Sequence, residues 1–561
     1  MGKAWCSLLM LGFVSLVLGQ EKYILSFQGQ QEQQEQVKEY QFNSQKALEE
    51  AVLKKRLKLI QQGFVFANID SLVWVEKSAT AYLFKGNKYE KLTIQADESS
   101  ARLLRKAGLT SFNNVLRLEF IPKKIENIFS SLLDYLENNG FPFASIQLSL
   151  DSLSSSGMIA DLVIEKGPEV SWTAVHIKGD VPISEKLVSN LIQIKEGDYY
   201  EEKKLQNIDA IFKQVLFIDE IKPHELLFTN EGAEVFLYLK SKPVSLINGI
   251  IGIQPNTITG KNVFTGDVKL KLQNTLLRGE LFNLNWRSLQ PGTQDLNVTA
   301  SYPFIFNSRF GTEGNFKLYK RDSSFLTTNA KVGIQYYFKG NNHLKFFYES
   351  ENSNLLSGAM NSDLANLSSV NNNRYGMGFS SIQLDYLPNP SKGAQIIIEG
   401  QLGKRTTYFT DSTTNSLSYK FKMNAECYLP ITRRNVLRLA NQTTSYYADQ
   451  IYSNELDRFG GLNTQRGFDE ETLFASTRTS FTVEYRFLVD QNSHAFAFFD
   501  QTIYENNTDT YYLDSPFGTG FGFSFGTGLG IFSISYAIGK QLGNPMLLRD
   551  GKIHFGYVAF F

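Results

Sequence analysis

Two hydrophobic periodicities divide the chain near Pro243. Before that residue, apolar side chains recur at the three- and four-residue spacing of an amphipathic helix, as they do over 123–139. After it, apolar and polar residues alternate over stretches of roughly 8 to 14 residues, with polar, Gly-rich or Asn-rich breaks between them. The pattern predicts α+β modules in the first part of the chain and an all-β structure over 244–561.

A repeat organises the first part. The segments 63–69 and 140–146, GFVFANI and GFPFASI, agree at five of seven positions and lie 77 residues apart. Each follows a predicted helix, which spans 45–62 in the first copy and 123–139 in the second. Gly63 and Gly140 therefore fall at helix C-caps, where a positive φ favours glycine. In each turn an aromatic residue follows the glycine, Phe64 in the first copy and Phe141 in the second.

Each copy continues with three predicted strands, of which the last are 89–94 and 170–177. A unit of one helix and three strands has little core of its own and is typical of a tandem array. A third copy without the Gly-Phe signature is predicted from two helices and two strands after Val181. We expect three modules, at 20–97, 98–180 and 181–243.

The second part contains sixteen predicted strands, eleven before residue 449 and five after residue 473. Over 417–429 every second residue is apolar, while Lys420, Lys422 and Glu426 occupy the other face; 479–487 repeats this pattern. Charges in mid-strand, aromatic apolar faces and connections of very different length favour a membrane barrel over a soluble sandwich. An even strand number and the cost of unpaired edges in lipid predict a closed sixteen-stranded antiparallel transmembrane barrel.

The first and last strands of a closed barrel must meet at a seam. The first predicted strand, 246–253, is short, holds Gly249, Ile250 and Gly252, and stops just before Pro255. The last one contains Tyr557 and ends at the aromatic Phe561. We expect few hydrogen bonds across this seam, and easier opening there than at any other strand pair.

Composition and charge refine this picture. The 56 basic and 56 acidic residues balance, which gives no reason to expect a nucleic-acid partner. An aromatic content of 13% with a mean hydropathy of −0.22 fits strands whose second face is polar. Residues 1–19 have the charged start, apolar middle and small-residue end of a cleaved secretory signal. Its removal would leave Cys427 as the one cysteine, so we expect no disulfide.

The long connection after the eleventh strand contains the sequence GGLNTQRGF, residues 460–468. Here the chain closely resembles the POTRA-barrel superfamily of BamA/TamA-like outer-membrane assembly factors. Barrels of that family carry an Arg-Gly-Phe/Tyr tip on a loop folded back into the lumen. The resemblance covers nearly the whole chain after residue 19, and it places Arg466, Gly467 and Phe468 at the tip.

The resemblance also implies partners for the tip arginine, because the family holds it with one acidic residue from each of the next two strands. Glu484 in VEYR and Asp500 in FFD match these positions, and strand alternation independently turns Glu484 toward the lumen. Thr502 stands where the family often has glycine. A guanidinium between two carboxylates would be strongly oriented by charge-assisted hydrogen bonds.

The sequence predicts no enzyme, no cofactor and no metal site. It contains no G-x-S-x-G element, and its five histidines lie singly without metal-ligand spacing. These are His176, His224, His343, His494 and His554. The glycines from Gly518 to Gly530 lack the following helix of a nucleotide loop, so we interpret them as sites of strand curvature and close backbone approach.

These features predict insertion or translocation of proteins at a bacterial outer membrane without ATP. Modules in the periplasm would capture extended client strands of unfolded outer-membrane or secreted proteins by β-augmentation, and the seam would open toward outer-membrane lipid. Whether an inner-membrane or lipoprotein partner takes part is left open by the sequence.

Two alternatives remain. A two-partner-type secretion pore would share the barrel and the arginine loop, but it usually has two modules and a plug helix, for which the Gln-rich stretch 28–41 is poorly suited. A passive porin would need no modules.

Overall fold

The computed structural model describes residues 22–29, 39–109, 114–154, 157–242, 244–255, 262–288, 292–359, 366–387, 389–527, 530–542 and 546–559. The predicted signal segment 1–19 and Phe561 lie outside these residues. The chain forms two compact units: one contains residues up to Val170 together with 200–202, and the other contains 171–199 and 203–561. No helix in the described ranges is long and apolar enough to cross a membrane.

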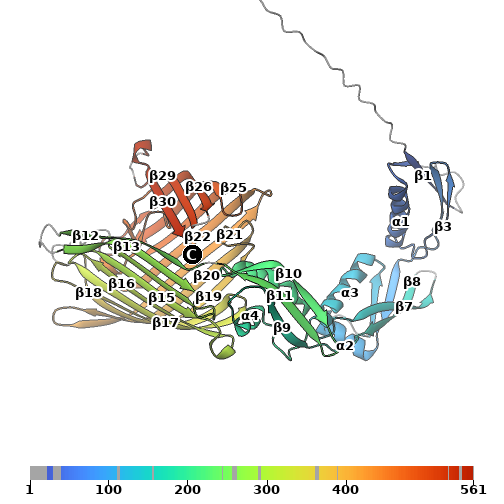
Figure 1. Cartoon of the computed structure of the whole chain (residues 1–561), viewed down its shortest axis with the longest axis horizontal. Helices are drawn as coiled ribbons and strands as arrows, with labels where there is room; N and C mark the ends of the chain where they lie inside the picture. The colour runs from blue at the N-terminus through green and yellow to red at the C-terminus, as the bar shows by residue number, and fades with distance from the viewer. Residues whose placement is uncertain are drawn as a thin grey trace, which may run out of the picture. The chain divides into compact units, whose positions relative to one another are not determined.

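The first unit contains two four-stranded sheets with helices packed on them (Figure 1). The elements of the first sheet are β1 (Tyr23–Gly29), β2 (Tyr40–Phe42), α1 (Gln45–Gln61), β3 (Asn68–Val75) and β4 (Ser78–Phe84). The strand order is β2-β1-β4-β3, with β1 parallel to β4. Ser44 caps α1 by accepting a hydrogen bond from the Ala47 N–H, and Leu48 is fully buried against the sheet.

The second sheet of this unit has the same design. Its elements are β5 (Lys91–Gln95), α2 (Glu98–Lys106), β6 (Val115–Glu119), α3 (Pro122–Glu137), β7 (Ser145–Leu153) and β8 (Gly157–Glu165). The strand order is β6-β5-β8-β7, and β5 is parallel to β8. Helix α3 buries Ile125, Leu132 and Leu136, which share the face that the helical periodicity predicted.

The second unit begins with a third sheet. Its elements are β9 (Trp172–Lys178), α4 (Glu185–Ile192), α5 (Glu202–Gln206), α6 (Ile208–Gln214), β10 (Ile218–Phe228) and β11 (Ala233–Ser241). The strand order is β10-β11-β9, with β9 parallel to β11. In each of the three sheets the first strand along the chain is therefore parallel to the last, so the third module has the topology of the others without the Gly-Phe signature.

The sheets begin one strand earlier than the predicted modules. The predicted strand 89–94 is β5, which pairs with β6 and β8 of the second sheet. The predicted strand 170–177 is β9, which pairs with β11 of the third sheet. The sheets thus change between β4 and β5 and between β8 and β9, instead of after residues 97 and 180. Local periodicity could not show this, because a parallel pair joins strands at the two ends of a module.

The two repeat glycines end their helices in the same way. Gly63 has a φ of 100° and Gly140 a φ of 89°, both in the left-handed region. The Phe64 N–H donates to the Leu59 carbonyl at 3.0 Å, and the Phe141 N–H donates to the Leu136 carbonyl at 3.0 Å. This bond from the second residue past the helix back to its last turn is the Schellman motif. The repeated GF pair therefore encodes one helix-to-strand turn.

The rest of the second unit is a large antiparallel sheet in which strands follow one another in sequence order (Figure 1). Its strands are β12 (Leu246–Pro255), β13 (Asn262–Gln273), β14 (Leu281–Ser288), β15 (Gln294–Tyr302), β16 (Phe310–Arg321), β17 (Phe325–Lys339), β18 (Asn342–Leu355), β19 (Ser369–Leu384), β20 (Gly393–Tyr408), β21 (Thr413–Pro430), β22 (Asn435–Ala448), β25 (Thr477–Leu488), β26 (His494–Asn506), β27 (Tyr512–Asp514), β28 (Phe517–Thr527), β29 (Gly530–Lys540) and β30 (Lys552–Ala559). Sixteen of these seventeen strands correspond to the predicted ones. The additional strand, β27, is a three-residue piece that pairs with the end of β26.

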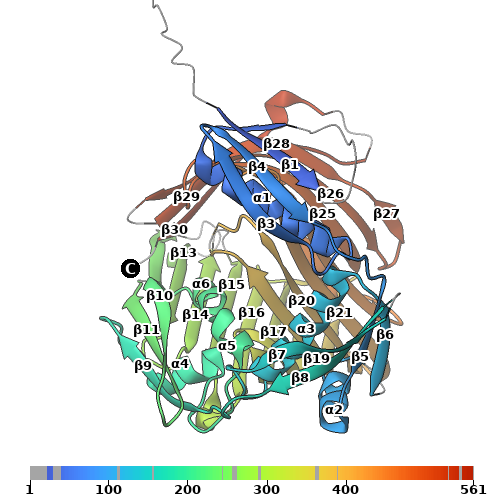
Figure 2. The same ribbon diagram turned by 90° about the vertical axis from the view of Figure 1, so that its right-hand side faces the viewer.

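The two ends of this sheet lie near each other without pairing. Figure 2 shows the sheet curling round, so that β30 lies close to its first strands. Among the described residues no hydrogen-bonded register joins β12 to β30, although each pairs along its length with its inner neighbour. The structure therefore differs from the closed barrel that was predicted. β12 ends at Pro255, which has no N–H to donate, and contains two glycines that offer no side chain for packing.

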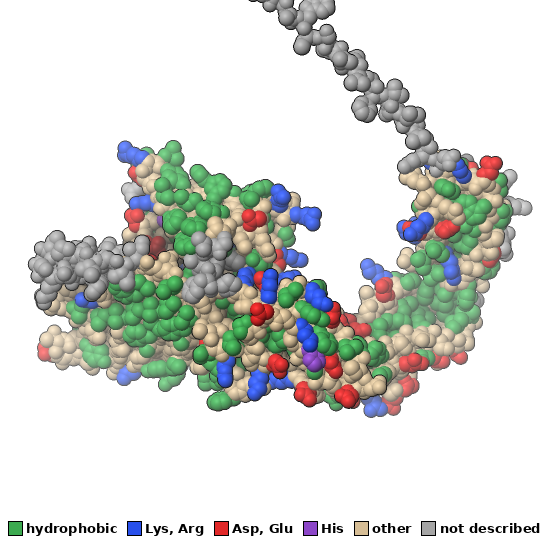
Figure 3. All heavy atoms as spheres, in the orientation of Figure 1, with side chains coloured by type: hydrophobic (Ala, Val, Ile, Leu, Met, Phe, Trp, Pro, Cys, Tyr) green, Lys and Arg blue, Asp and Glu red, His purple; other side chains and the backbone are tan. Residues whose placement is uncertain are grey.

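The two faces of the sheet differ as the alternation predicted. On β21, Leu417 and Tyr419 are 56% and 46% exposed, whereas Ser418 between them is fully buried. Lys420 lies on the Ser418 face, where it pairs with Glu351 of β18 at 3.1 Å. Figure 3 shows broad hydrophobic areas over the outer surface of the large sheet. The apolar side chains thus point outward, and the charged ones point inward.

Candidate functional site

The connection between β22 and β25 forms a short hairpin. β23 (Asp457–Phe459) pairs antiparallel with β24 (Leu473–Ala475), and Phe459 is fully buried against Leu473 and Tyr504. Two consecutive glycines with positive φ, Gly460 and Gly461, then turn the chain into a tip that contains Arg466. Phe468 packs against the same cluster as Phe459. The hairpin stem therefore holds the tip in a fixed position.

The structure brings Arg466, Glu484 and Asp500 together. The guanidinium donates to Asp500 through Nε and Nη2, each at 2.7 Å, and to Glu484 through Nη1 at 2.7 Å. It also lies over the ring of Phe498, with Cζ 3.4 Å from the centroid. The three charged residues are at most 8% exposed. Such a bidentate, buried and stacked arginine has one well-defined orientation.

Glu484 and Asp500 do not depend on Arg466 to the same degree. Glu484 also accepts a hydrogen bond from Arg486 at 2.8 Å and lies 3.8 Å from a nitrogen of Arg438. Asp500 has no second cation within ion-pair distance in the described part of the chain, and its other side-chain donor is the Thr482 hydroxyl at 2.8 Å. The charge of Asp500 is therefore balanced by Arg466 alone.

Glycines let the tip backbone lie directly on the barrel wall. Gly467 has a φ of 91°, and a Cβ on it would come within 2.6 Å of the Gly539 backbone nitrogen on β29. A Cβ on Gly518 of β28 would collide with the Arg466 carbonyl oxygen. Close backbone approach, which the glycine-rich segment was expected to permit, thus occurs at the arginine tip itself.

Two neighbours of the arginine were not predicted to contact it: Gln465 was not singled out, and Thr502 was noted only as a departure from the family pattern. Gln465 is fully buried, and its amide donates to the Asp500 carbonyl oxygen at 3.2 Å. The Thr502 hydroxyl donates to the Gln465 side chain and lies 2.6 Å from the Ser480 hydroxyl. Thr502, which departs from the family pattern, therefore takes part in the same network. The polar residue at 465 beside the RGF motif was the only sequence signal for it.

The loop has further attachments along its length. Before the tip, Glu455 accepts two hydrogen bonds from Arg405 of β20, at 2.9 and 2.6 Å, and one from the Tyr446 hydroxyl at 2.7 Å. Next to it, Asp457 accepts from Arg478 of β25 at 2.6 Å. Nothing in the spacing of these residues indicated their pairing, because the partners lie on different strands.

Just after the tip, two acidic residues connect the loop to both ends of the sheet. Asp469 pairs with Lys552 of β30 at 2.9 Å, and Glu471 pairs with Arg287 of β14 at 2.6 Å. The Gly467 N–H also donates to Nε2 of His554 on β30 at 3.2 Å. We call the segment 467–471 the strap. It links the last strand to the third strand of the sheet, on opposite sides of the unpaired seam.

The predicted seam residues lie on the two end strands. Gly249, Ile250 and Gly252 lie opposite Val268, Asp267 and Thr265 of β13. Tyr557 lies on β30, where its ring stacks on Phe532 of β29 at a centroid distance of 4.2 Å. Phe561 is outside the described residues. In the described part of the chain, no strand pairing joins these positions across the seam.

The interior of the sheet is polar and partly filled by the loop. A cavity of about 990 Å³ is lined by inward side chains of the strands and by loop residues such as Leu462, Asn463 and Glu470. Two of its lining carboxylates, Glu349 and Glu351, accept hydrogen bonds from the fully buried Arg374 at 2.9 and 2.7 Å. The interior is thus a water-accommodating space with charged walls.

No family model matches the chain, and no curated protein matches it by sequence. Solved structures do match. CdiB from Acinetobacter baumannii aligns with a TM-score of 0.52 and 14% identity over 92% of this chain and 98% of that chain. CdiB from Escherichia coli aligns with a TM-score of 0.51 and 12% identity over 92% and 97%. BamA from Haemophilus ducreyi lacking POTRA domains 1-3 aligns with a TM-score of 0.42 and 14% identity over 83% and 99%. The chain therefore has the fold of the CdiB barrel proteins, in agreement with the predicted resemblance to BamA/TamA-like barrels.

Proposed function

We propose that this protein inserts or translocates other proteins at a bacterial outer membrane, with its three modules in the periplasm. The observation that carries the proposal is the arginine loop, which is buried inside a large curled sheet whose two end strands, over their described residues, are not paired with each other. A passive pore has no use for an unpaired seam. The fold shared with CdiB and the outward apolar face support placement in a membrane. No step in this function requires ATP or catalysis.

The modules supply edges for client strands. β7 is an edge strand of the second sheet, and it leaves Leu150 and Leu153 each 46% exposed. In the first sheet, the described residues of β2 pair with β1 over Tyr23–Leu25 and not along its later residues. Main-chain hydrogen bonds at such edges bind an extended segment without strict dependence on its sequence. Unfolded outer-membrane or secreted proteins are clients of this kind.

The strap sets how readily the seam opens. Because it attaches to β30 through Asp469 and to β14 through Glu471, sideways separation of the end strands must break one of these ion pairs. Asp469 is 65% exposed and Glu471 is 29% exposed, so each pair contributes only about 0 to 1 kcal/mol. That amount biases the seam toward its near-closed state and leaves opening possible for a client strand.

The double variant Asp469→Asn, Glu471→Gln is expected to open more easily than the parent. One cysteine at Ile250 and one at Tyr557 should then cross-link to each other about two to ten times more slowly than in the parent. This range corresponds to a loss of about 0.5 to 1.4 kcal/mol in the free energy that the two ion pairs contribute to the near-closed state. The Arg549→Ala variant is the matched control, because Arg549 forms an exposed pair with Asp550 outside the loop. Equal cross-linking rates in all three proteins would contradict a role for the strap.

A dedicated secretion role is the second candidate, and a specific observation favours it. Two solved structures that share the fold over nearly their whole length are CdiB proteins, which are of the two-partner secretion type. Against it, three modules precede the barrel here, whereas transporters of that type usually have two. A porin is a less well supported alternative, because it does not explain the modules.

Depletion of the protein followed by quantitative proteomics of the outer membrane separates these functions. We expect the abundance of several barrel proteins to fall together, because a binder of main-chain edges serves many clients. Re-expression of the parent chain should restore them. Loss of a single secreted protein would instead identify a dedicated transporter, and an unchanged outer membrane would contradict both forms of the proposal.

A further inference from the structure

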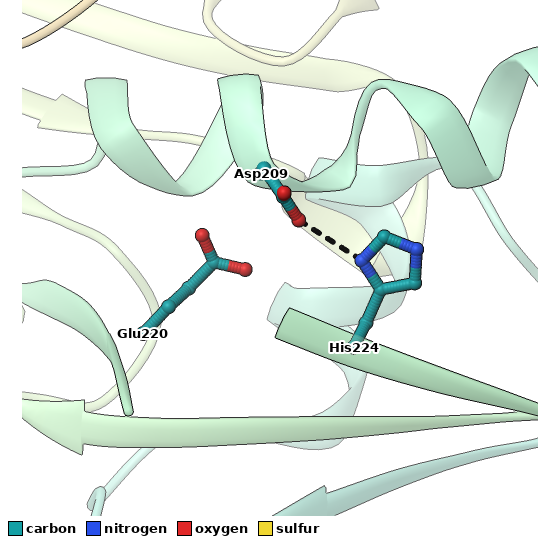
Figure 4. Close-up of side chains that lie close together, drawn as sticks. All are labelled: Asp209, Glu220 and His224. Atoms are coloured by element: carbon teal, nitrogen blue, oxygen red, sulfur yellow. Dashed lines mark hydrogen bonds and ion pairs between the residues drawn. The ribbon is translucent and has the colours of Figure 1, made fainter. Parts of the chain in front are cut away.

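Three side chains of the third module meet where helix α6 crosses the edge strand β10. Asp209 comes from α6, and Glu220 and His224 come from β10 (Figure 4). One oxygen of each carboxylate and one ring nitrogen of His224 lie within 4.8 Å of one another. His224 Nδ1 is 2.9 Å from Asp209 Oδ1. The three groups are half-buried, so they are accessible to small ions.

The shape of β10 explains this convergence. In a regular strand, residues four positions apart are separated by about 13 Å, at about 3.3 Å per residue. In β10, Glu220 lies opposite Leu239 and Glu225 lies opposite Phe236, so five steps along β10 match three along β11. These two irregularities shorten the strand around Pro223, which an edge strand tolerates. Glu220 and His224 are thereby brought to one side of the sheet, facing α6.

The charges of the cluster are incompletely balanced. Burial, and next the carboxylate of Asp209, raise the pKa of Glu220 to about 7, while Lys213 of α6 acts weakly in the other direction. Among the described residues, Glu220 has no cation within ion-pair distance. Lys213 is the one cation that contributes to its electrostatic environment. Two facing carboxylates beside an imidazole form a set of donors suited to a divalent cation.

We propose that Asp209, Glu220 and His224 bind one divalent transition-metal ion of the Zn²⁺ class. Two carboxylates and one imidazole supply three of the four ligands of a tetrahedral zinc ion, with water as the fourth. The imidazole disfavours Mg²⁺ and Ca²⁺, which prefer oxygen ligands throughout. Metal–ligand bonds of about 2.0–2.2 Å require ligand atoms about 3.3 Å apart. Small rotations of these half-buried side chains would bring the ligand atoms from within 4.8 Å of one another to that spacing.

A metal ion here would join α6 to β10 more firmly than the single His224–Asp209 contact that now links their side chains at 2.9 Å. Helix α6 also touches the barrel, because Ile211 lies 3.5 Å from the Cβ position of Gly340, in the turn between β17 and β18. The ion would thus stiffen the part of the module that adjoins the barrel. It would also reinforce an edge strand whose irregular register makes it a poor template for client strands.

The test is a titration of the full-length, untagged chain in detergent, stripped of metal with a chelator, against Zn²⁺ in a calorimeter. We expect one saturable site per chain. Glu220→Gln and His224→Ala should each weaken it by at least about tenfold, since even outer-shell changes cost that much. The control is His176→Ala: His176 pairs with Glu234 at 2.9 Å in the same module, but this pair lacks a third ligand.

Two results would overturn the proposal. One is the absence of saturable Zn²⁺ binding by the parent chain. The other is an affinity that Glu220→Gln leaves unchanged, since this substitution keeps the shape of the side chain and tests ligation directly if His224→Ala fails to fold. A rise in the melting temperature of the parent chain with Zn²⁺, absent from Glu220→Gln, would support the site by a second measurement.

Discussion

Replacing Arg466 by alanine is expected to undock the loop tip and abolish client assembly while the barrel stays in the membrane. The substitution leaves Asp500 buried with a hydroxyl and a backbone N–H as its remaining donors. Removal of one partner from a buried ion pair costs about 3–5 kcal/mol. The docked fraction of the loop should therefore fall more than about a hundredfold. Barrel strands persist, because their ladder hydrogen bonds do not involve Arg466.

Limited proteolysis within 460–470 and an assembly assay measure the two effects. A second substitution separates loss of the arginine from the burial of an unpaired charge. In Arg466→Ala, Asp500→Asn, the stranded carboxylate is removed, so the loop should dock better than in Arg466→Ala alone. Glu484 needs no such relief, since Arg486 remains beside it. Parent-like protease resistance and activity in Arg466→Ala would show that the tip contact is dispensable.

Locking the seam is expected to stop client release into lipid. With Cys427, a free thiol on β21, replaced by serine, cysteines at Ile250 and Tyr557 can be joined by a short bifunctional maleimide. No strand pairing joins the described residues of the two end strands, so the covalent link should add a strong barrier to opening. Insertion of a model client should fall to background after cross-linking and recover with a cleavable reagent.

The control uses the same position on β30. Cysteines at Phe532 and Tyr557 join β29 to β30, which are already paired at these residues. That link leaves the seam untouched and should leave client insertion at the parent level. If the seam cross-link also leaves insertion unchanged, lateral opening is not how clients leave, and passage through the interior becomes the favoured route.

Most elements could be predicted from the local spacing of apolar and polar residues, because this periodicity indicates which face of a segment is buried. The helix over 123–139 and the sixteen strands correspond to elements of the structure for this reason, and GFPFASI marked its turn through one glycine with positive φ. Pattern could not assign β5 and β9 to their sheets. Their parallel partners, β8 and β11, lie at the far end of each module, and alternation is the same whichever sheet a strand joins.

The arginine site also contains both residues that the sequence marked and contacts that it did not. Arg466, Glu484 and Asp500 were predicted together because short motifs of this chain resemble those of the BamA/TamA-like family, and strand alternation also supported Glu484. Gln465 and Thr502 carried almost no signal, yet they complete the network around Asp500. No sequence signal marked the pairing of Glu471 with Arg287, which are 184 residues apart.

The sequence by itself determined the modular first part and the alternating strands, because each shows as spacing along one segment, and it marked the arginine tip through a short motif that resembles a known family. Only the tertiary structure decided which charges meet: the strap across the seam, and Asp209, Glu220 and His224 at one point of β10. His224 stood alone in the sequence, since Asp209 comes from another element and the approach of Glu220 depends on the irregular register of β10. Contacts between distant segments depend on sheet curvature and strand irregularities, which arise from the packing of the whole sheet.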